Sequence, residues 1–528
     1  MYSFAPLERR VAIIDLGSNT ARLMIAQYTQ DRVFKITDEV SRRVRLGEGI
    51  AGDGRLRSAA RSRALDAVRM FKSFCDAQGI DHILPVATAA VRDAGNGARF
   101  LDEITRGTWL NFRLISGEEE AFYSTVGVIN SLGLFDGIIL DVGGGSAEIG
   151  LIRDGAFAKG ASTPFGTVRT TETYFPGPEV TPGQTKRLDG DIDRALEGIG
   201  WLKTDGKVPV AGVGGVVRAL VRIDRMERKY PLGLVHGYEL KRRRLEKLIE
   251  RIASMPVSER SRRIPGLQKE REDIILGGAM IVFGVMRKTG ARILTVSGQG
   301  LREGLFFEEA FKPASKPDSI GRLRRFTVLN LARLYGYEGA HTGHVARLSL
   351  SMYDQLQEMH GYGKREREYL WAAALLHDIG TVIDYYDHHK HSAYIILNAG
   401  LPGFDHREIV IIAWLCLNHR RGKPNFSRYQ SLLKKEERTM VYRLSSLLRL
   451  SEYLDRSRAQ IVEDVKLETG SRKVRMKVVP RDGRDVTVEL SEARNRVQLF
   501  EECFGRRLAI ELDRTGGKGD PSGPSRAN

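Results

Sequence analysis

The chain carries the stretch Asp15-Leu16-Gly17-Ser18-Asn19-Thr20-Ala21-Arg22-Leu23, in which a glycine turn joins two apolar runs. It carries the stretch again as Asp141-Val142-Gly143-Gly144-Gly145-Ser146-Ala147-Glu148-Ile149. Laid over each other, the copies read Asp-x-Gly-x-x-[Thr/Ser]-Ala-[Arg/Glu]-[Leu/Ile]. Apolar residues of β type precede both turns, at 11–14 and at 138–140. Each copy therefore predicts a strand, a glycine turn and a second strand.

The two predicted turns have the composition of an anion site. Glycine allows backbone conformations closed to other residues and leaves room for a ligand to approach the chain. Successive N–H groups of such a turn form a concavity that attracts anions. Thr20 and Ser146 add hydroxyl groups, while Asp15 and Asp141 add carboxylates that suit an oxygen-liganded cation such as Mg²⁺. One Asp-x-Gly after a strand is also typical of an ordinary turn, but two matching copies favour a pair of phosphate cradles.

The first 311 residues alternate strands with helices. A helical pattern at 58–78 lies between strand patterns in the first half. In the second half a glycine segment at 208–215 precedes an apolar helical run. Two similar halves of this kind predict an α/β fold with a cleft between two lobes, at 1–135 and 136–311. The further strands expected lie at 32–38, 83–87, 112–115 and 293–297.

The pattern changes after residue 311. A linker is predicted at 312–318, which contains two prolines, and an all-helical domain at 319–458. Alternation with period two at 465–468, 473–479, 485–490 and 508–512 then predicts strands of a small α+β module over 463–512. The tail, 513–528, is rich in Gly, Pro and Ser and is predicted to be disordered.

Composition narrows the class of protein. Of the 528 residues, 42% are hydrophobic and 28% charged, as in ordinary globular proteins. The net charge of +17 favours polyanionic partners, although a solvated basic surface would explain it equally. No nucleic-acid motif is present, and no apolar run approaches the length of a membrane span. Without a secretory signal, and with three scattered cysteines, we expect a cytoplasmic protein.

Hydrolysis of a phosphate chain needs a metal, a base for the attacking water and a cation for the developing charge. Asp141 and Glu148 flank the second turn, so both can face a metal there. Glu120 begins a predicted helix, from which a carboxylate reaches a bound water. Arg92 lies between a strand and a helix, where a guanidinium group can fork onto phosphate oxygens. The acidic triplet 118–120 would also be explained by the helix dipole alone.

The combination of IDLGSNTARL (14–23), TAAVR (88–92), SGEEEA (116–121), LDVGGGSAEI (140–149), GVGG (212–215) and GLREG (300–304) resembles the exopolyphosphatase/guanosine pentaphosphate phosphohydrolase (Ppx/GppA) family. The family implies two lobes of the actin/ribonuclease-H-like fold and Mg²⁺-dependent removal of the terminal phosphate from polyphosphate or pppGpp. The one departure is Val216, where a Thr or Ser is expected after the glycines.

The resemblance also implies roles for individual residues. Glu120 would be the general base, and Arg92 would bind the terminal phosphoryl group. Asp141 and Glu148 would place Mg²⁺ or Mn²⁺, and a homodimer is expected. The phosphates would lie in the cradle of Gly17, Ser18, Asn19, Thr20, Gly143, Gly144, Gly145 and Ser146.

The helical region resembles an HD-type phosphohydrolase domain. Its motifs are His341-Thr-Gly-His, the pair His377-Asp378 and Asp455. By the HD pattern, His341, His377, Asp378 and Asp455 are ligands of a divalent metal. His391 and His419 match positions that hold a second metal in some HD domains. The alternative is an HD fold without metal, kept for packing and for lining a polyphosphate channel.

Three functions follow from these patterns. The first is a phosphohydrolase acting on polyphosphate or pppGpp. The second is an actin-like ATPase or kinase, because a pair of Asp-x-Gly turns also holds ATP. The third is a non-enzymatic sensor that binds polyphosphate or (p)ppGpp. The basic composition slightly favours polyphosphate, the longer of the two polyanions.

Overall fold

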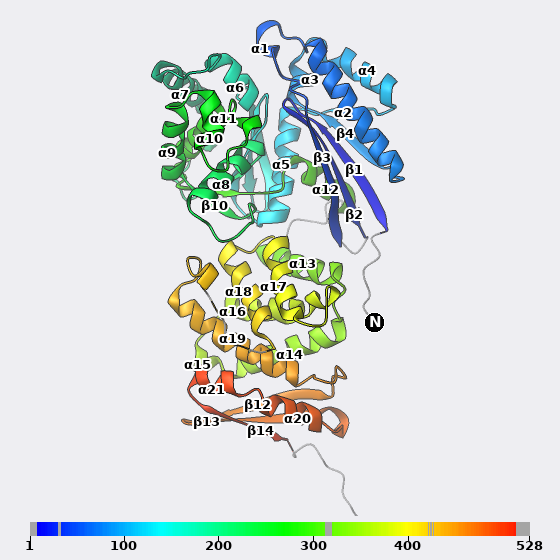
Figure 1. Ribbon diagram of the computed structural model, residues 1–528, viewed down its shortest axis with the longest axis vertical. Helices are drawn as coiled ribbons and strands as arrows, with labels where there is room; N and C mark the ends of the chain where they lie inside the picture. Colours follow the sequence, from blue (N-terminus) through cyan, green and yellow to red (C-terminus); the bar gives the residue numbers. More distant parts are fainter. Residues whose placement is uncertain are drawn as a thin grey trace, which may run out of the picture. The chain divides into compact units, whose positions relative to one another are not determined.

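The computed structural model describes residues 8–29, 33–311, 319–420, 422, 425 and 427–513 (Figure 1). The chain divides into two compact units. The α/β unit comprises the described residues of 8–327 with 402–405, and the C-terminal unit comprises those of 328–401 and 406–513. The predicted linker at 312–318 and the predicted disordered tail beyond Asp513 lie outside the described residues.

The α/β unit contains two sheets with the same strand order. The first runs β3-β2-β1-β4-β5 and the second β8-β7-β6-β9-β11, followed by an additional edge strand, β10. In both sheets the first two pairings are antiparallel and the next two parallel. The repeat in the sequence is therefore a repeat of the fold, and the α/β prediction is confirmed. The strands are β1 Arg9–Leu16, β2 Thr20–Tyr28, β3 Phe34–Arg43, β4 Ile83–Ala87, β5 Arg113–Leu114, β6 Gly137–Val142, β7 Ala147–Arg153, β8 Ala156–Thr163, β9 Val210–Val213, β10 Tyr238–Lys241 and β11 Ile293–Val296.

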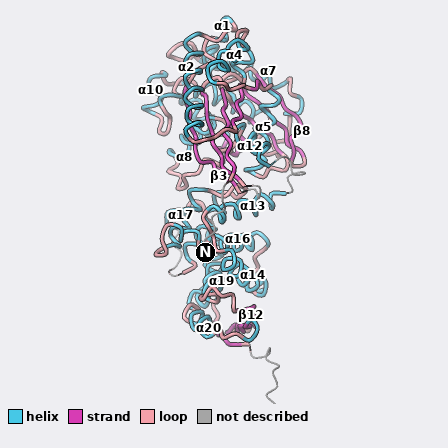
Figure 2. Tube along the Cα trace, turned by 90° about the vertical axis from the view of Figure 1, so that its right-hand side faces the viewer, coloured by secondary structure: helices cyan, strands magenta, loops and turns pink. Residues whose placement is uncertain are grey.

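Side chains of β1 alternate between two buried cores. Ala12 and Ile14 pack into one core with residues of α2 (Ser58–Ala77) and α4 (Gly97–Thr108). Val11 and Ile13 pack into the other with residues of α5 (Gly117–Leu132) and α12 (Leu301–Phe311). Because strand side chains alternate across a sheet, a strand covered on both faces reads as a continuous apolar run. The helices beside the strands are visible in Figure 2.

One segment packs differently from the sequence-based division at residue 135. The sequence assigns 301–311 to the second lobe, yet α12 packs on the first sheet through Phe306 and Phe307. Phe306 meets Tyr28 and Phe34 of the first sheet with ring centroids 5.7 and 5.2 Å apart. An apolar helix does not reveal from its sequence which of two sheets it covers. The helices around the second sheet include α6 Thr167–Tyr174, α7 Pro182–Glu197, α8 Gly215–Glu227, α9 Arg242–Ala253, α10 Val257–Arg263 and α11 Ile275–Lys288.

The C-terminal unit begins with helices, as predicted. Between 319 and 458 the described residues form no strand. Among the described residues, no helix of this or the other unit is both long and apolar enough to cross a membrane. The helices of this region are α13 Ser319–Leu334, α14 Gly339–Gln355, α15 Gln357–His360, α16 Lys364–Leu376, α17 His388–Ala399, α18 His406–Asn418 and α19 Lys435–Tyr453.

The unit ends in a sheet of β12 (Val462–Thr469), β13 (Lys473–Pro480) and β14 (Arg507–Leu512), with α20 (Thr487–Arg494) and α21 (Gln498–Phe504). The strand predicted at 485–490 is wrong, because this segment enters α20. Val486, Leu490 and Ala493 share a buried helical face, whereas Val488 is 56% exposed. The Asp485 carboxylate accepts hydrogen bonds from the amide and hydroxyl of Thr487, which starts the helix. A run of only six alternating residues is compatible with the period of a strand and with that of a helix, so the sequence did not distinguish them.

Candidate active site

The two glycine turns lie against each other in the α/β unit. A Cβ atom on Gly144 would lie 2.9 Å from the amide nitrogen of Asn19, and one on Gly145 would lie 2.7 Å from Ser18 Oγ. Only glycine permits backbones to approach this closely. The turns are also built alike, since a Cβ on Gly17 would meet the Thr20 carbonyl and one on Gly143 the Ser146 carbonyl, at 3.0 and 3.1 Å.

Both turns line one cavity of about 130 Å³. The walls contain all eight residues predicted to cradle phosphates, which are Gly17, Ser18, Asn19, Thr20, Gly143, Gly144, Gly145 and Ser146. The structure therefore brings together residues that lie more than a hundred positions apart in the sequence. Backbone amides and hydroxyl groups on two facing turns form a concave surface suited to an extended anion.

Five carboxylates line the same cavity: Asp15, Glu120, Asp141, Glu148 and Glu303. Asp141 Oδ2 accepts a hydrogen bond from Ser124 Oγ at 2.6 Å. Glu148 Oε1 accepts one from Ser162 Oγ at 3.0 Å. These two hydroxyl groups orient the carboxylates from behind. An all-oxygen set of this kind fits Mg²⁺, which prefers carboxylate oxygens and retained water.

Burial dominates the electrostatics of these acids. Desolvation raises the pKa values of Asp15 and Asp141. Burial raises the pKa of Glu148 to about 7, with the Ser146 hydroxyl opposing and the Asp141 charge adding to the shift. Burial and then the charge of Glu148 raise the pKa of Glu120 well above its usual range. Carboxylates gathered away from water resist ionisation until a cation joins them.

Glu120 differs from its two acidic neighbours. Glu119 closes a capping box, since its carboxylate accepts from the Ser116 amide and Ser116 Oγ accepts from the Glu119 amide. Glu118 is exposed. Glu120 is 7% exposed and, of the three, is the one that lines the cavity. The capping interpretation is therefore sufficient for Glu119, but it does not explain Glu120.

Arg92, on α3 (Ala89–Asp93), is held behind Glu120. Its Nη1 donates to Glu120 Oε1 at 2.5 Å and to the Ile115 carbonyl at 2.9 Å. Arg92 is not among the cavity-lining residues. The structure thus joins the two predicted catalytic residues to each other, and the direct contact of Arg92 with phosphate stays a prediction.

Arginines that the sequence did not single out also line the cavity. Arg22, Arg218 and Arg271 come from β2, α8 and the short 3-10 helix Lys269–Arg271. None of the three forms an ion pair with a described residue. Burial, followed by the charges of Arg218 and Arg302, lowers the pKa of Arg22 to about 10. Half-buried guanidinium groups that lack an ion-pair partner among the described residues indicate an anionic ligand.

The glycine segment at 212–215 explains how one of these arginines reaches the cavity. A Cβ on Gly215 would lie 2.7 Å from Arg271 Nη2, so glycine lets this guanidinium group reach the cavity wall. Val216, found where a Thr or Ser is expected, is buried and also lines the cavity. The sequence around Arg271 is a charged run without a motif, so it gave no indication that this arginine lines the cavity.

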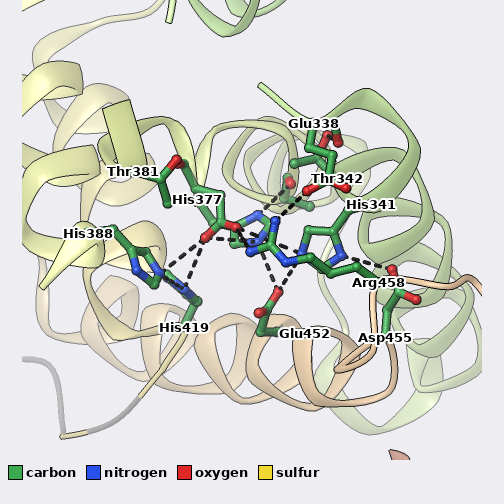
Figure 3. Close-up of polar contacts among 12 residues, drawn as sticks. Glu338, His341, Thr342, His377, Thr381, His388, His419, Glu452, Asp455 and Arg458 are labelled. Atoms are coloured by element: carbon green, nitrogen blue, oxygen red, sulfur yellow. Dashed lines mark hydrogen bonds and ion pairs between the residues drawn. The ribbon is translucent and has the colours of Figure 1, made fainter. Parts of the chain in front are cut away.

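The predicted metal ligands of the helical region lie in the C-terminal unit (Figure 3). His341, His377 and Asp378 offer ligand atoms within 4.8 Å of one another, as do Asp378, His388 and His419. The structure differs from the prediction at two positions. His391 is in neither group, and His388, one turn earlier in α17, faces His419 instead. Asp455 binds Nδ1 of His341, on the far side of the ring, at 2.8 Å.

Comparison with known proteins identifies relatives of both units. A model of the Ppx/GppA phosphatase family matches residues 24–312, and a model of the Ppx/GppA phosphatase domain III matches residues 323–514. The Aquifex aeolicus member of the Ppx/GppA family is 28% identical, with a TM-score of 0.50, over 58% of this chain and 99% of that one. An exopolyphosphatase from Cytophaga hutchinsonii shares the fold at 22% identity and a TM-score of 0.54, over 57% of this chain and 98% of its own.

Proposed function

The chain belongs to the Ppx/GppA phosphatase family, and we propose that it hydrolyses the terminal phosphoanhydride bond of inorganic polyphosphate or of pppGpp with Mg²⁺. The observation that carries the proposal is the position of Glu120, buried in the cavity that both glycine turns line. The exopolyphosphatase among the structural neighbours supports the same class of substrate.

In the proposed reaction the turns bind the phosphates and Glu120 activates water. Amides and hydroxyl groups of the two turns hold the chain of phosphates in the cavity. The buried Glu120 carboxylate accepts a proton from the water that attacks the terminal phosphorus, and Arg92 orients this carboxylate through its 2.5 Å hydrogen bond. Asp141 and Glu148 would hold Mg²⁺, which when bound neutralises phosphate charge.

We favour polyphosphate over pppGpp as the main substrate. The unpaired guanidinium groups of Arg22, Arg218 and Arg271 line the cavity, and the whole chain carries a net charge of +17. A long polyanion offers several phosphates to these cations at once, whereas pppGpp offers one short chain at each end of a neutral nucleoside. Charge of one sign along a cavity raises the local concentration of such a ligand.

Release of phosphate by the full chain tests the proposal. With Mg²⁺, we expect release from long polyphosphate and from pppGpp without any acceptor, and faster turnover of polyphosphate. Glu120→Gln should lower kcat by about 10²- to 10⁴-fold, which is the usual contribution of a general base. Glu118→Gln is the matched control, because that side chain is exposed on the same helical turn.

Two other functions are distinguished by the same assay. Turnover of ATP that requires an acceptor, with no release from polyphosphate, would assign the cavity to an actin-like kinase. Tight binding of polyphosphate without turnover by the parent would assign it to a sensor. Either result, or full activity of Glu120→Gln, would overturn the proposed hydrolysis.

A further inference from the structure

Helix α6 is attached to the second glycine turn through its backbone. The amides of Val168 and Arg169, in the first turn of the helix, donate to the Gly144 carbonyl at 2.9 and 3.2 Å. A Cβ on Gly166 would lie 2.3 Å from the carbonyl carbon of Gly144, so the chain that enters the helix packs directly against the glycine turn. Because these contacts join backbone to backbone, a movement of α6 carries the second turn with it.

Two side chains of α6 reach the first lobe. Arg169 Nη2 donates to Asp93 Oδ2 at 2.6 Å. Both carboxylate oxygens of Glu172 accept from the Gly49 amide, at 3.2 Å each. Positions 169 and 172 lie on one face of the helix, since residues three apart are neighbours on its surface. Asp93 ends α3, and Gly49 precedes α1 (Ile50–Asp53), which lies beside α6 in Figure 1. Helix α6 therefore connects the second turn to the first lobe.

Asp93 links this contact to Glu120. Its Oδ1 lies 3.6 Å from Nε of Arg92, and Arg92 Nη1 donates to Glu120 Oε1 at 2.5 Å. Charges of alternating sign thus run from α6 to the cavity, on Arg169, Asp93, Arg92 and Glu120. The side chains of Arg169 and Asp93 are 24% and 32% exposed, and neither is among the described residues that line the cavity. These two residues can affect the reaction only through their neighbours.

We propose that Arg169 is a positioning residue for the hydrolysis and acts through Asp93. It holds the Arg92–Glu120 pair of the first lobe at a fixed position relative to the second turn. Water activated by Glu120 must meet a phosphorus atom whose phosphate chain is bound in part by that turn, so the relative position of the two lobes sets the rate. This inference rests on the proposed function, because Glu120 is a base only if the cavity hydrolyses a phosphoanhydride bond.

The alternative is an ordinary surface ion pair between Arg169 and Asp93. A partly exposed pair usually contributes little to stability, and its removal leaves turnover unchanged. The pair described here differs in two respects, since it joins the two lobes and since Asp93 also lies against Arg92. Positioning predicts a loss of kcat without a change in KM, whereas contact of Arg169 with substrate would raise KM.

Steady-state kinetics with long polyphosphate and Mg²⁺ separate these possibilities. Arg169→Met removes the charge and leaves an unbranched side chain. Its kcat should fall about tenfold or more, while KM changes by less than about twofold. Arg169→Lys keeps a cation and should recover part of the loss. The matched control is Arg194→Met, which removes a 75% exposed arginine from an ion pair of the same lobe and should keep the kcat of the parent.

A double-mutant cycle tests the route through Asp93. Asp93→Asn should lower kcat by a factor similar to that of Arg169→Met. The double variant should be no slower than the slower of the two single variants, because both substitutions break the same chain of contacts. Circular dichroism confirms that each variant is folded.

Hydrogen exchange of the protein without substrate tests the contact between the lobes independently of turnover. The Gly49 amide reports on this contact, because its acceptor Glu172 belongs to the other lobe. In Arg169→Met a peptide that contains Gly49 should exchange faster than in the parent, whereas a peptide from the buried strand β9 should exchange at the same rate.

The outcomes separate this inference from the proposed function. A parent that releases no phosphate overturns the hydrolysis itself. With an active parent, the role of Arg169 alone is overturned if Arg169→Met keeps the parent's kcat, if it raises KM instead, or if its effect and that of Asp93→Asn multiply in the double variant. Unchanged exchange at Gly49 in Arg169→Met overturns it as well.

Discussion

Glu148 lies directly opposite Asp141 in the antiparallel ladder between β6 and β7. In the equivalent ladder of the first sheet, Arg22 lies opposite Asp15. The same position of the repeat thus carries a carboxylate in one copy and a guanidinium group in the other. The second turn gathers negative charge that a cation would neutralise, whereas the first turn carries its own cation. We therefore expect a metal to bind at the second turn and phosphate oxygens to bind at the first.

The buried carboxylates at the second turn predict that the stability of the metal-free protein depends on pH. The pKa of Glu148 is raised from 4.5 to about 7 in the folded protein. The folded state therefore holds this proton more tightly than the unfolded chain. Its contribution is complete below pH 4.5 and is lost as pH rises through 7, by about 3 kcal/mol from the size of the shift.

Denaturant unfolding of the parent and of Glu148→Gln in chelator measures this contribution. Between pH 4.5 and 8, the parent should lose about 3 kcal/mol of unfolding free energy relative to the variant. Mg²⁺ should restore much of the loss in the parent at pH 8 and have little effect at pH 4.5. A difference between the two proteins that is constant across this range would contradict the prediction.

Removal of Arg92 should alter the pH dependence of the reaction. The Arg92 guanidinium hydrogen-bonds the Glu120 carboxylate and opposes the rise of its pKa. In Arg92→Ala the pKa of Glu120 should rise further, so the base is deprotonated only at higher pH. We expect kcat at neutral pH to fall at least tenfold and the rising limb of the pH–kcat profile to move to higher pH.

The control for this prediction is Arg99→Ala, which removes an arginine whose side chain is 80% exposed. Its profile should match that of the parent. If Arg92→Ala lowers kcat by the same factor at every pH, Arg92 acts on the phosphoryl group alone and does not tune Glu120.

The close approach of the two turns predicts a specific rescue. In Gly145→Ala the new methyl group would lie 2.7 Å from Ser18 Oγ, and the turns must separate. Activity should fall by an order of magnitude or more, because a small displacement of the cradle misplaces the phosphates. Ser18→Ala in the same chain removes the obstructing oxygen and should recover part of the activity.

Gly190→Ala provides the comparison, since no atom lies within 4 Å of the position of its Cβ. This helical substitution should leave turnover unchanged. If Ser18→Ala does not improve Gly145→Ala, contact between the two turns is not the reason for the loss.

The sequence predicted those parts of the site that are encoded locally. A glycine turn between apolar runs specifies a hairpin whatever its surroundings, and Ser116 with Glu119 specifies a helix start that leaves Glu120 in the first turn. Arg271 was missed because a short 3-10 helix brings it to the cavity and Gly215 admits it. Neither effect leaves a pattern along the chain.

The predicted metal ligands of the C-terminal unit show the same limit. His388 and His391 are one helical turn apart, and only packing decides which of them meets His419. Asp455 and Glu452 lie three residues apart, yet they approach opposite nitrogens of His341. Residue type and spacing identified the cluster, but which atom faces which is set by tertiary structure.

The unpaired arginines predict how substrate length affects affinity. Arg218 and Arg271 line the cavity, and burial lowers the pKa of each, which marks them as cations held without full compensation. Arg271→Ala should raise KM for long polyphosphate by about tenfold, the value of one lost charge-assisted hydrogen bond, and change kcat little. The increase should be smaller for a short substrate such as tripolyphosphate, and it should diminish as salt screens the charges.

Arg263→Ala controls for the loss of net charge, because the side chain of Arg263 is 63% exposed. Initial rates over a series of chain lengths and salt concentrations measure these effects. An equal rise in KM at every chain length would place Arg271 at the reacting phosphate and not along the chain.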